Sequence, residues 1–220
     1  NDVDDFNRIN LQADVSYDYD DNGNLIRLVG DDEVLHLTYD SLNRLICCDN
    51  GNAQWRYTYD YSGRRLSKND KYFLYQGDFE FSSFVGDSCR ELRVLGRSSG
   101  SDLGAAISIE LDGSVYVPIH DHRSNTCLLM DLSGRAVDRH HYDAFGETED
   151  LSAVDNPWLF SSKRLDPETG WYYFGKRYYV PELGLFSTSD PMGYSEGPNL
   201  YSYVNANPLV WVDPYGLFAE

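Results

Sequence analysis

The sequence is poor in basic residues. Its 220 residues hold 18 Lys and Arg against 36 Asp and Glu, a formal charge of −18. Because phosphate binding needs clustered Lys and Arg, we expect no nucleic-acid partner for this fragment. The sequence also lacks an apolar run of membrane-spanning length, about 20 residues, and its start has no basic and apolar leader. We therefore expect no membrane span. The start reads like the middle of a pattern, so we expect further chain before Asn1.

Cysteine and recognisable metal or phosphate motifs are scarce as well. The four cysteines have no C-x-x-C spacing, which predicts free thiols in a reducing compartment rather than a zinc site or a disulfide framework. They are Cys47, Cys48, Cys89 and Cys127. We interpret four histidines as surface or cross-strand residues, because none has a Cys or acidic partner at a familiar offset: His120, His122, His140 and His141. No glycine-rich phosphate loop is present. We expect neither a metal nor a cofactor.

Aromatic residues and glycine are abundant. The sequence has 18 Tyr, 10 Phe, 4 Trp and 18 Gly, a composition that favours strands and turns. Three Tyr-Asp pairs follow one another at intervals of 20 residues, each after an alternating run and before a polar turn: Tyr19-Asp20, Tyr39-Asp40 and Tyr59-Asp60. Each unit has the size of one β-hairpin and must stack on its neighbours to bury its apolar face. The sequence therefore predicts an all-β protein.

A second block of hairpins follows between residues 105 and 146. Asp112-Gly113 is a strong hairpin signal between two alternating runs, and Tyr142-Asp143 closes a fourth Tyr-Asp unit. We expect a mobile loop at 98–101 and a polar connector at 147–156. Asp143 and Asp166 read as turn residues. We interpret the many tyrosines as cross-strand ladders that stiffen a thin sheet rather than as a sugar-binding surface.

The end of the chain carries the densest set of motifs. It contains two Asp-Pro pairs, at Asp190 and Asp213, an arginine in Arg177-Tyr178-Tyr179, and a final Asp-Pro-Tyr-Gly-Leu ending at Leu217. Together with the Tyr-Asp units, these motifs resemble the YD repeats and the Rhs-associated core domain of rearrangement-hotspot (Rhs) toxin proteins. The resemblance is dense over 157–217 and looser over 15–147. The chain departs from it at Val180, where the family usually has Asp, and at Leu185, where it usually has Arg.

The resemblance implies a fold and an activity. In such proteins the repeats form a hollow spiral β-sheet shell, or cocoon, around a C-terminal toxin, closed by a core plug with short helical turns. The core domain cuts its own chain once, after the Leu of Asp-Pro-x-Gly-Leu. The cut would fall here between Leu217 and Phe218. We accordingly expect a YD-repeat shell segment at 1–156, an autoprotease core domain at 157–217 and the start of the toxin at 218–220.

The resemblance also implies partners and a location. The partners would be the encapsulated toxin domain, the N-terminal remainder of the shell, and a spike of a secretion apparatus or a component of an insecticidal toxin complex. It also allows a homodimer. The protein would be made in the bacterial cytoplasm and secreted or injected through a specialised secretion system such as type VI, for competition between bacteria.

The residues themselves fit an aspartyl-protease mechanism. Two nearby carboxylates that share one proton can activate a water and protonate the leaving group, so Asp190 and Asp213 are the candidate pair. Asp213 lies four residues before Leu217, which keeps the bond near it. Arg177 would orient a carboxylate or stabilise the oxyanion. We expect a single turnover and no activity on added peptides. A free glycosidase is disfavoured. The alternative is a cell-surface YD-repeat protein that binds carbohydrate or partner cells, with a purely structural core region.

Overall fold

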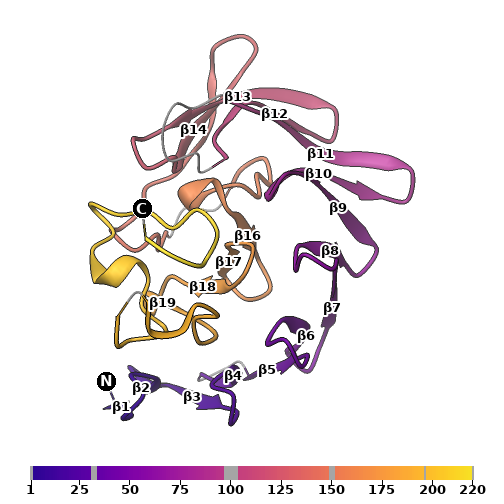
Figure 1. Cartoon of the computed structure of the whole chain (residues 1–220). Coiled ribbons are helices and arrows are strands. Elements are labelled where there is room, and N and C mark those ends of the chain that lie inside the picture. The colour runs from indigo at the N-terminus through magenta and orange to yellow at the C-terminus, as the bar shows by residue number, and fades with distance from the viewer. Residues whose placement is uncertain (1, 31–33, 97–103, 149–151, 196, 220) are drawn as a thin grey trace.

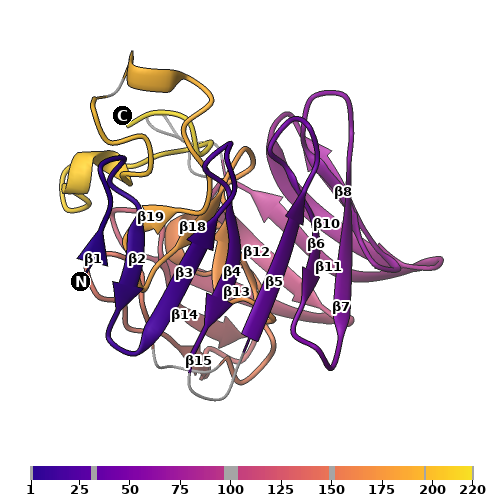
Figure 2. The ribbon, with the colours of Figure 1, turned by 90° about the horizontal axis from the view of Figure 1, so that it is seen from below.

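The computed structural model describes residues 2–30, 34–96, 104–148, 152–195 and 197–219. The expected loop at 98–101, part of the expected connector and Glu220 lie outside these ranges. The described residues confirm the all-β prediction, with two antiparallel sheets and three 3₁₀ turns. Figure 1 shows the larger sheet curving around the C-terminal part of the chain, which fills its concave side. Figure 2 shows its strands lying side by side in sequence order.

The larger sheet has fifteen strands in the described residues. Each pairs with the next along the chain, so the sheet is a succession of hairpins. The strands are β1 (Asp2–Val3), β2 (Ile9–Gln12), β3 (Val15–Tyr19), β4 (Leu25–Val29), β5 (Val34–Tyr39), β6 (Leu45–Asp49), β7 (Gln54–Tyr59), β8 (Arg65–Lys68), β9 (Lys71–Gln76), β10 (Phe79–Val85), β11 (Ser88–Leu95), β12 (Ala106–Leu111), β13 (Ser114–His120), β14 (Thr126–Asp131) and β15 (Ala136–Arg139).

The smaller sheet lies inside the curve. It has the order β16 (Arg164–Asp166), β17 (Trp171–Tyr173), β18 (Tyr178–Val180) and β19 (Leu185–Phe186). Three short turns flank it: η1 (Phe160–Ser162), η2 (Gly193–Ser195) and η3 (Val204–Ala206). The two sheets divide the chain between Arg139 and Arg164. The finer domain boundaries at 156 and 217 stay a prediction.

An aspartate carboxylate builds the turn of each Tyr-Asp hairpin. Oδ1 of Asp40 accepts the backbone N–H groups of Leu42 at 2.9 Å and Arg44 at 3.0 Å, while Oδ2 accepts Nε of Arg44 at 2.7 Å. Asn43 completes the turn with φ +58°. The same bonds to the second and fourth following N–H groups recur in six other turns, which begin at Asp4, Asp20, Asp60, Asp121, Asp131 and Asp143. The Asp side chain thus accepts the backbone N–H groups of the turn, which otherwise have no acceptor. This explains why Asp follows Tyr in each repeat.

The predicted turn role of Asp143 is confirmed, although Tyr142 before it lies outside the strands. The expected fourth hairpin is therefore only a turn. The reading of the histidines was wrong for His140, which is 2% exposed. Its Nε2 lies 3.0 Å from Oδ2 of Asp138, two residues earlier in the chain. All four cysteines are free thiols, as predicted, and Cys48 is buried.

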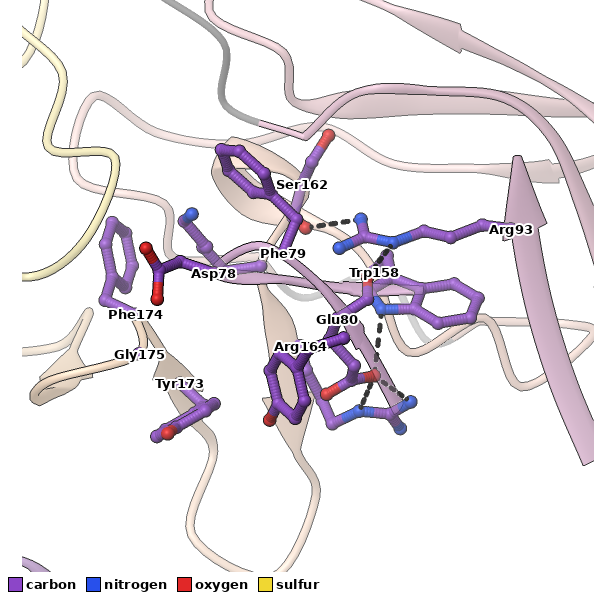
Figure 3. A pocket seen from close by; sticks show the side chains of 12 residues that line it. Asp78, Phe79, Glu80, Arg93, Trp158, Ser162, Arg164, Tyr173, Phe174 and Gly175 are labelled. Carbon is purple, nitrogen blue, oxygen red and sulfur yellow. Dashed lines mark hydrogen bonds and ion pairs between the residues drawn. The ribbon is translucent and has the colours of Figure 1, made fainter. Parts of the chain in front are cut away.

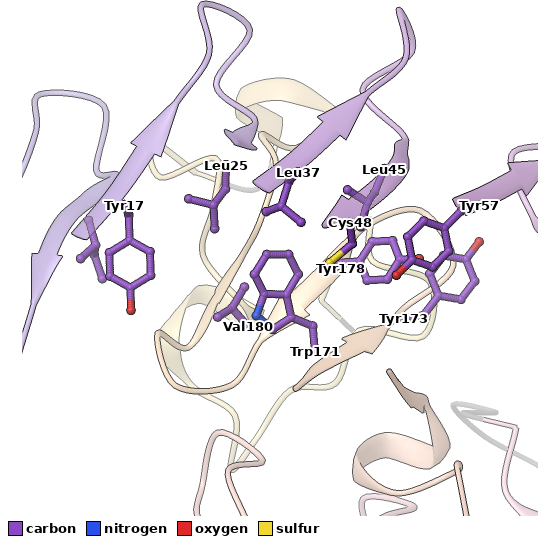
Figure 4. Packing of buried hydrophobic residues seen from close by; sticks show 11 residues of the cluster. Tyr17, Leu25, Leu37, Leu45, Cys48, Tyr57, Trp171, Tyr173, Tyr178 and Val180 are labelled. Carbon is purple, nitrogen blue, oxygen red and sulfur yellow. The ribbon is translucent and has the colours of Figure 1, made fainter. Parts of the chain in front are cut away.

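The core of the first half is shared between the two sheets. Inward-facing side chains of the early hairpins pack on aromatic and aliphatic side chains of β17 and β18 (Figure 4). The cluster comprises Ile9, Tyr17, Leu25, Leu37, Leu45, Cys48, Tyr57, Trp171, Tyr173, Tyr178 and Val180. A thin sheet cannot bury its apolar face by itself. The smaller sheet therefore serves as the filling on which the larger one folds.

Charged side chains of β16 fix how the smaller sheet sits on the larger one. Arg164 contacts Glu80 Oε1 at 2.6 Å and Glu91 Oε2 at 2.5 Å, and Figure 3 shows the part of this network around Glu80. Two residues on, Asp166 forms a bidentate pair with Arg65, which is wholly buried. Burial opposes ionisation of Glu91, yet Arg164 lowers its pKa to about 2. The two charges of β16 therefore meet opposite charges on the larger sheet.

The ion pair with Arg65 shows that the interpretation of Asp166 as only a turn residue was wrong. Its backbone carbonyl does open the turn to Gly170, with N···O 2.9 Å. Its carboxylate, however, is 1% exposed and is committed to Arg65 across the two sheets. The sequence did hold a signal for this pair: residues 25, 45 and 65 are equivalent in the repeat, and the first two are buried leucines. An arginine in an inward, apolar place requires a buried acid.

Candidate active site

Asp213 caps a turn of the same type as the hairpin turns of the larger sheet. Its Oδ1 accepts the backbone N–H groups of Tyr215 at 3.0 Å, Gly216 at 2.7 Å and Leu217 at 3.1 Å. Gly216 supplies φ +73°, and a Cβ there would lie 3.1 Å from the backbone N of Arg177. The positive φ and this close approach together favour glycine at this position. The carboxylate therefore holds the backbone up to the residue whose carbonyl belongs to the predicted scissile bond.

Arg177 brings the two predicted aspartates together. Its Nη2 lies 2.9 Å from Oδ2 of Asp190 and 3.8 Å from Oδ2 of Asp213. Nε of the same guanidinium donates to the carbonyl of Gly216 at 2.7 Å. The group also lies 3.7 Å from the ring centroid of Phe186, which closes one of its faces. The two predicted aspartates thus meet at the guanidinium of the predicted Arg177, which also binds the Gly216–Leu217 peptide.

The loop that carries Asp190 is anchored on the hairpin formed by β3 and β4 of the larger sheet. The N–H of Asp190 donates to the carbonyl of Leu200 at 3.0 Å. Next to Leu200, the Tyr201 hydroxyl donates to the carbonyl of Gly23 at 2.9 Å. Oδ1 of Asp190 accepts the N–H of Met192 at 2.7 Å, so this aspartate also opens a capped turn. Its Oδ2 remains directed to Arg177.

Burial separates Asp213 electrostatically from the hairpin aspartates. Its side chain is 3% exposed, and desolvation raises its pKa despite the three N–H donors and Arg177. Asp40 is 21% exposed, and bonds from Arg44 outweigh its weaker desolvation and lower its pKa. Burial is the main cause of the difference, and the residue four places on adds to it, since this residue is Arg44 in one turn and Leu217 in the other. A carboxylate without its own arginine, and removed from water, retains a proton more readily.

A cavity of about 420 Å³ lies beside the Asp190 loop, lined by Ser189, Tyr194 and Leu200 among others, whereas the cavity that Arg177 lines measures only about 10 Å³. A cavity of only about 30 Å³ lies between the two sheets, lined by Phe79, Glu80, Arg93 and Phe174 among others (Figure 3). It has room for about one water molecule. Within the described residues no group of three His, Cys, Asp or Glu side chains is arranged to hold a metal ion.

A curved sheet of Asp-capped hairpins around an aromatic core defines this chain as a YD-repeat shell protein. The family model described as Teneurin YD-shell matches residues 2–209. The chain belongs to the Teneurin YD-shell family. None of the described helical segments has the length and apolar character to cross a membrane.

The chain is also similar to bacterial toxins. Double-stranded DNA deaminase toxin A of Burkholderia cenocepacia is 29% identical over 96% of the chain and 17% of its own length. The tRNA3(Ser)-specific nuclease WapA of Bacillus spizizenii is 30% identical over 96% of the chain and 9% of its own length. Toxin protein Tse5 of Pseudomonas aeruginosa is 27% identical over 96% of the chain and 19% of its own length. The chain therefore spans less than a fifth of each of these relatives. The predicted kinship with Rhs-type toxins is confirmed.

The fold has a counterpart among solved structures. The crystal structure of TcdB2-TccC3 without its hypervariable C-terminal region superposes with a TM-score of 0.65 at 19% identity. The match covers 92% of this chain and 13% of that chain. At this identity the likeness concerns the fold alone. It confirms the predicted shell architecture.

Proposed function

We propose that this chain is the C-terminal part of a bacterial toxin carrier that cuts its own backbone once, between Leu217 and Phe218. The observation that carries the proposal is the meeting of Asp190 and Asp213 at one guanidinium, with Asp213 also holding the N–H of Leu217. Chain connectivity keeps Asp213 within four residues of the Leu217–Phe218 bond, and Arg177 links Asp213 to the second acid, Asp190. The toxin names of the relatives support the carrier part of the proposal.

The two aspartates would divide the proton transfers between them. Asp190, ion-paired with Arg177, takes a proton from a water whose oxygen attacks the Leu217 carbonyl carbon. Asp213, whose pKa is raised by burial, gives its proton to the carbonyl oxygen. As the C–N bond breaks, Asp190 passes its proton to the Phe218 nitrogen and Asp213 regains its own from the collapsing diol. The products are a carboxyl group on Leu217 and an amine on Phe218.

Arg177 would support both transfers. Its ion pair with Asp190 orients that carboxylate, and its charge, which binds the Gly216 carbonyl one residue away, would stabilise negative charge on the Leu217 carbonyl oxygen until Asp213 protonates it. Removing one such donor costs about 10²–10³-fold in rate in other hydrolases. In this proposal the toxin that follows the cut stays inside the shell without a covalent link. The secretion partner, the remainder of the shell and a homodimer stay predictions.

The test is the intact mass of the purified chain and of three variants. Cleavage should remove the mass of Phe-Ala-Glu from the parent, or split the longer natural polypeptide after Leu217. Asp190→Asn and Asp213→Asn should stay whole. The matched control is Asp40→Asn, which alters the same kind of turn in the sheet and should still cut. A parent that stays whole, or an Asp213→Asn variant that cuts as the parent does, would overturn the proposal and favour the structural, partner-binding alternative.

A further inference from the structure

Three consecutive carbonyls lead up to the proposed scissile bond, and each has a basic residue as its donor. Nζ of Lys163 donates to Pro214 O at 2.6 Å, and the backbone N of Lys176 donates to Tyr215 O at 3.1 Å. Nε of Arg177 donates to Gly216 O. On the opposite side of the same peptide units, Asp213 accepts the N–H groups. The backbone before Leu217 is thereby held from both sides.

The ammonium of Lys163, like the guanidinium of Arg177, is buried. The residue is 8% exposed and lies between η1 and β16, about fifty positions before Pro214 in the chain. Its Nζ lies 5.5 Å from the ring centroid of Phe79 and 5.6 Å from that of Phe174. Burying a cation is costly unless it is compensated. The aromatic faces and the Pro214 carbonyl supply such compensation.

Phe79 ties this arrangement to the larger sheet. It is the first residue of β10, whereas Lys163 and Phe174 belong to the region of the smaller sheet. The ring of Phe79 also packs on Tyr215, with centroids 5.8 Å apart. Both Lys163 and Tyr215 therefore contact one side chain of the shell. Their positions depend on β10 being in place.

We infer that Lys163 is a positioning residue for the cut after Leu217, and that through Phe79 it makes the cut depend on the docking of strand β10. This inference rests on the proposed self-cleavage and adds a residue and a folding condition to it. The ammonium touches neither reacting atom. It fixes the Pro214 carbonyl, and with it the turn in which Asp213 faces the Leu217 peptide. The cut would then follow shell assembly rather than precede it.

The test compares cleavage rates of freshly folded chains by intact mass. Lys163→Met keeps the apolar stem and removes the charge, and it should slow cleavage by about 10²-fold, the cost of a displacement of about 1 Å. Phe79→Leu should slow it as well, although it lies far from the bond in sequence. The matched control is Lys71→Met, which breaks the Lys71–Glu91 ion pair in the sheet and should cut at the parental rate.

A second readout separates positioning from general destabilisation. In Asp190→Asn chains, which are expected to stay whole, adding Lys163→Met should speed hydrogen exchange at Tyr215, Gly216 and Leu217 while leaving exchange in β3–β7 unchanged. If Lys163→Met and Phe79→Leu both cut at the parental rate, the inference is wrong and the proposed function stands. If the parent does not cut, both are wrong. If Lys163→Met fails to fold, the Phe79→Leu rate decides.

Discussion

The turns of the larger sheet and the turn at the end of the chain use one piece of backbone chemistry for two purposes. In both, an aspartate Oδ1 caps the following N–H groups, and a residue with positive φ closes the turn. They differ in the second carboxylate oxygen. Oδ2 of Asp40 and Asp60 is neutralised by an arginine four residues on, at 2.6 and 2.7 Å. At Asp213 the fourth residue is Leu217, and Oδ2 faces Arg177 at 3.8 Å.

This comparison shows how one type of turn can hold carboxylates in two different electrostatic environments. A hairpin turn already fixes a carboxylate against its own backbone. Replacing the local arginine by an apolar residue and burying the turn changes the pKa of the acid from lowered to raised. The same turn also places the next peptide bond beside the acid.

The largest expected difference is between the cleavage rates of variants at Arg177 and at Arg44. Arg177→Gln should slow cleavage by about 10²–10³-fold, because it removes the group shared by the two acids and the Gly216 carbonyl. Arg177→Lys should recover only part of the rate, since the fork that bridges the groups is lost. Arg44→Gln, which removes the arginine of a hairpin turn, should leave the rate unchanged. Time-resolved intact mass measures all three. Equal loss in Arg44→Gln and Arg177→Gln would break the comparison.

The next contrast concerns stability at buried and exposed ion pairs. Arg65→Met removes the bidentate partner of the buried Asp166, which keeps only the longer contact of Lys68 Nζ with Oδ1 at 3.5 Å, and should lower the free energy of unfolding by about 3–5 kcal/mol. Arg135→Met removes an arginine that is 77% exposed from the pair with Asp131 and should cost about 0.2–1 kcal/mol. Urea unfolding monitored by tryptophan fluorescence gives both values. Similar losses of unfolding free energy in the two variants would show that the buried Arg65–Asp166 ion pair does not hold the two sheets together.

Glycines of two turns provide a smaller contrast. Gly134 and Gly146 have φ of +83° and +88°, so alanine strains either turn by about 1 kcal/mol. A Cβ on Gly134 would meet no atom within 4 Å, whereas on Gly146 it would lie 2.5 Å from the Phe160 ring. Gly146→Ala should therefore cost about 1–3 kcal/mol more than Gly134→Ala. Thermal denaturation of the two variants checks this order, and a reversed order would contradict the packing described around Phe160.

The smallest contrast is in acid stability. The lowered pKa of Asp40 means that its contribution is present above the unfolded pKa, about 3.9, and is lost as pH falls through the folded value. Asp40→Asn should therefore cost about 0.2–1 kcal/mol at neutral pH and progressively less below pH 4. Urea midpoints of parent and variant between pH 2 and 7, roughly the span over which carboxylates titrate, measure the gap. A gap that widens on acidification has the wrong sign for this account.

Much of the fold was accessible from the sequence because its signals are local. The interval between Tyr19, Tyr39 and Tyr59 gave the hairpins, and the polar residues after each gave the turns. The meeting of Asp190, Asp213 and Arg177 was expected from the resemblance to Rhs proteins rather than from periodicity. Their catalytic roles remain proposals.

The contacts between distant segments were not accessible in this way. Lys163 reaches Pro214, and Arg164 reaches Glu80, only because the smaller sheet docks inside the larger one. Both side-chain contacts join segments far apart in the sequence, so no local pattern predicts them. His140 was misread for a related reason, since its burial depends on packing rather than on its neighbours in sequence.

The pH dependence of the single cleavage step tests the central claim most directly. Burial raises the pKa of Asp213, so its proton is retained to higher pH than on an ordinary carboxyl and is lost as pH rises through that value. The cleavage rate of the folded parent, followed by intact mass between roughly pH 4 and 8, should therefore fall as pH rises through the Asp213 pKa. A rate that stays flat or climbs across this range would contradict the claim that the buried acid of this turn is the proton donor.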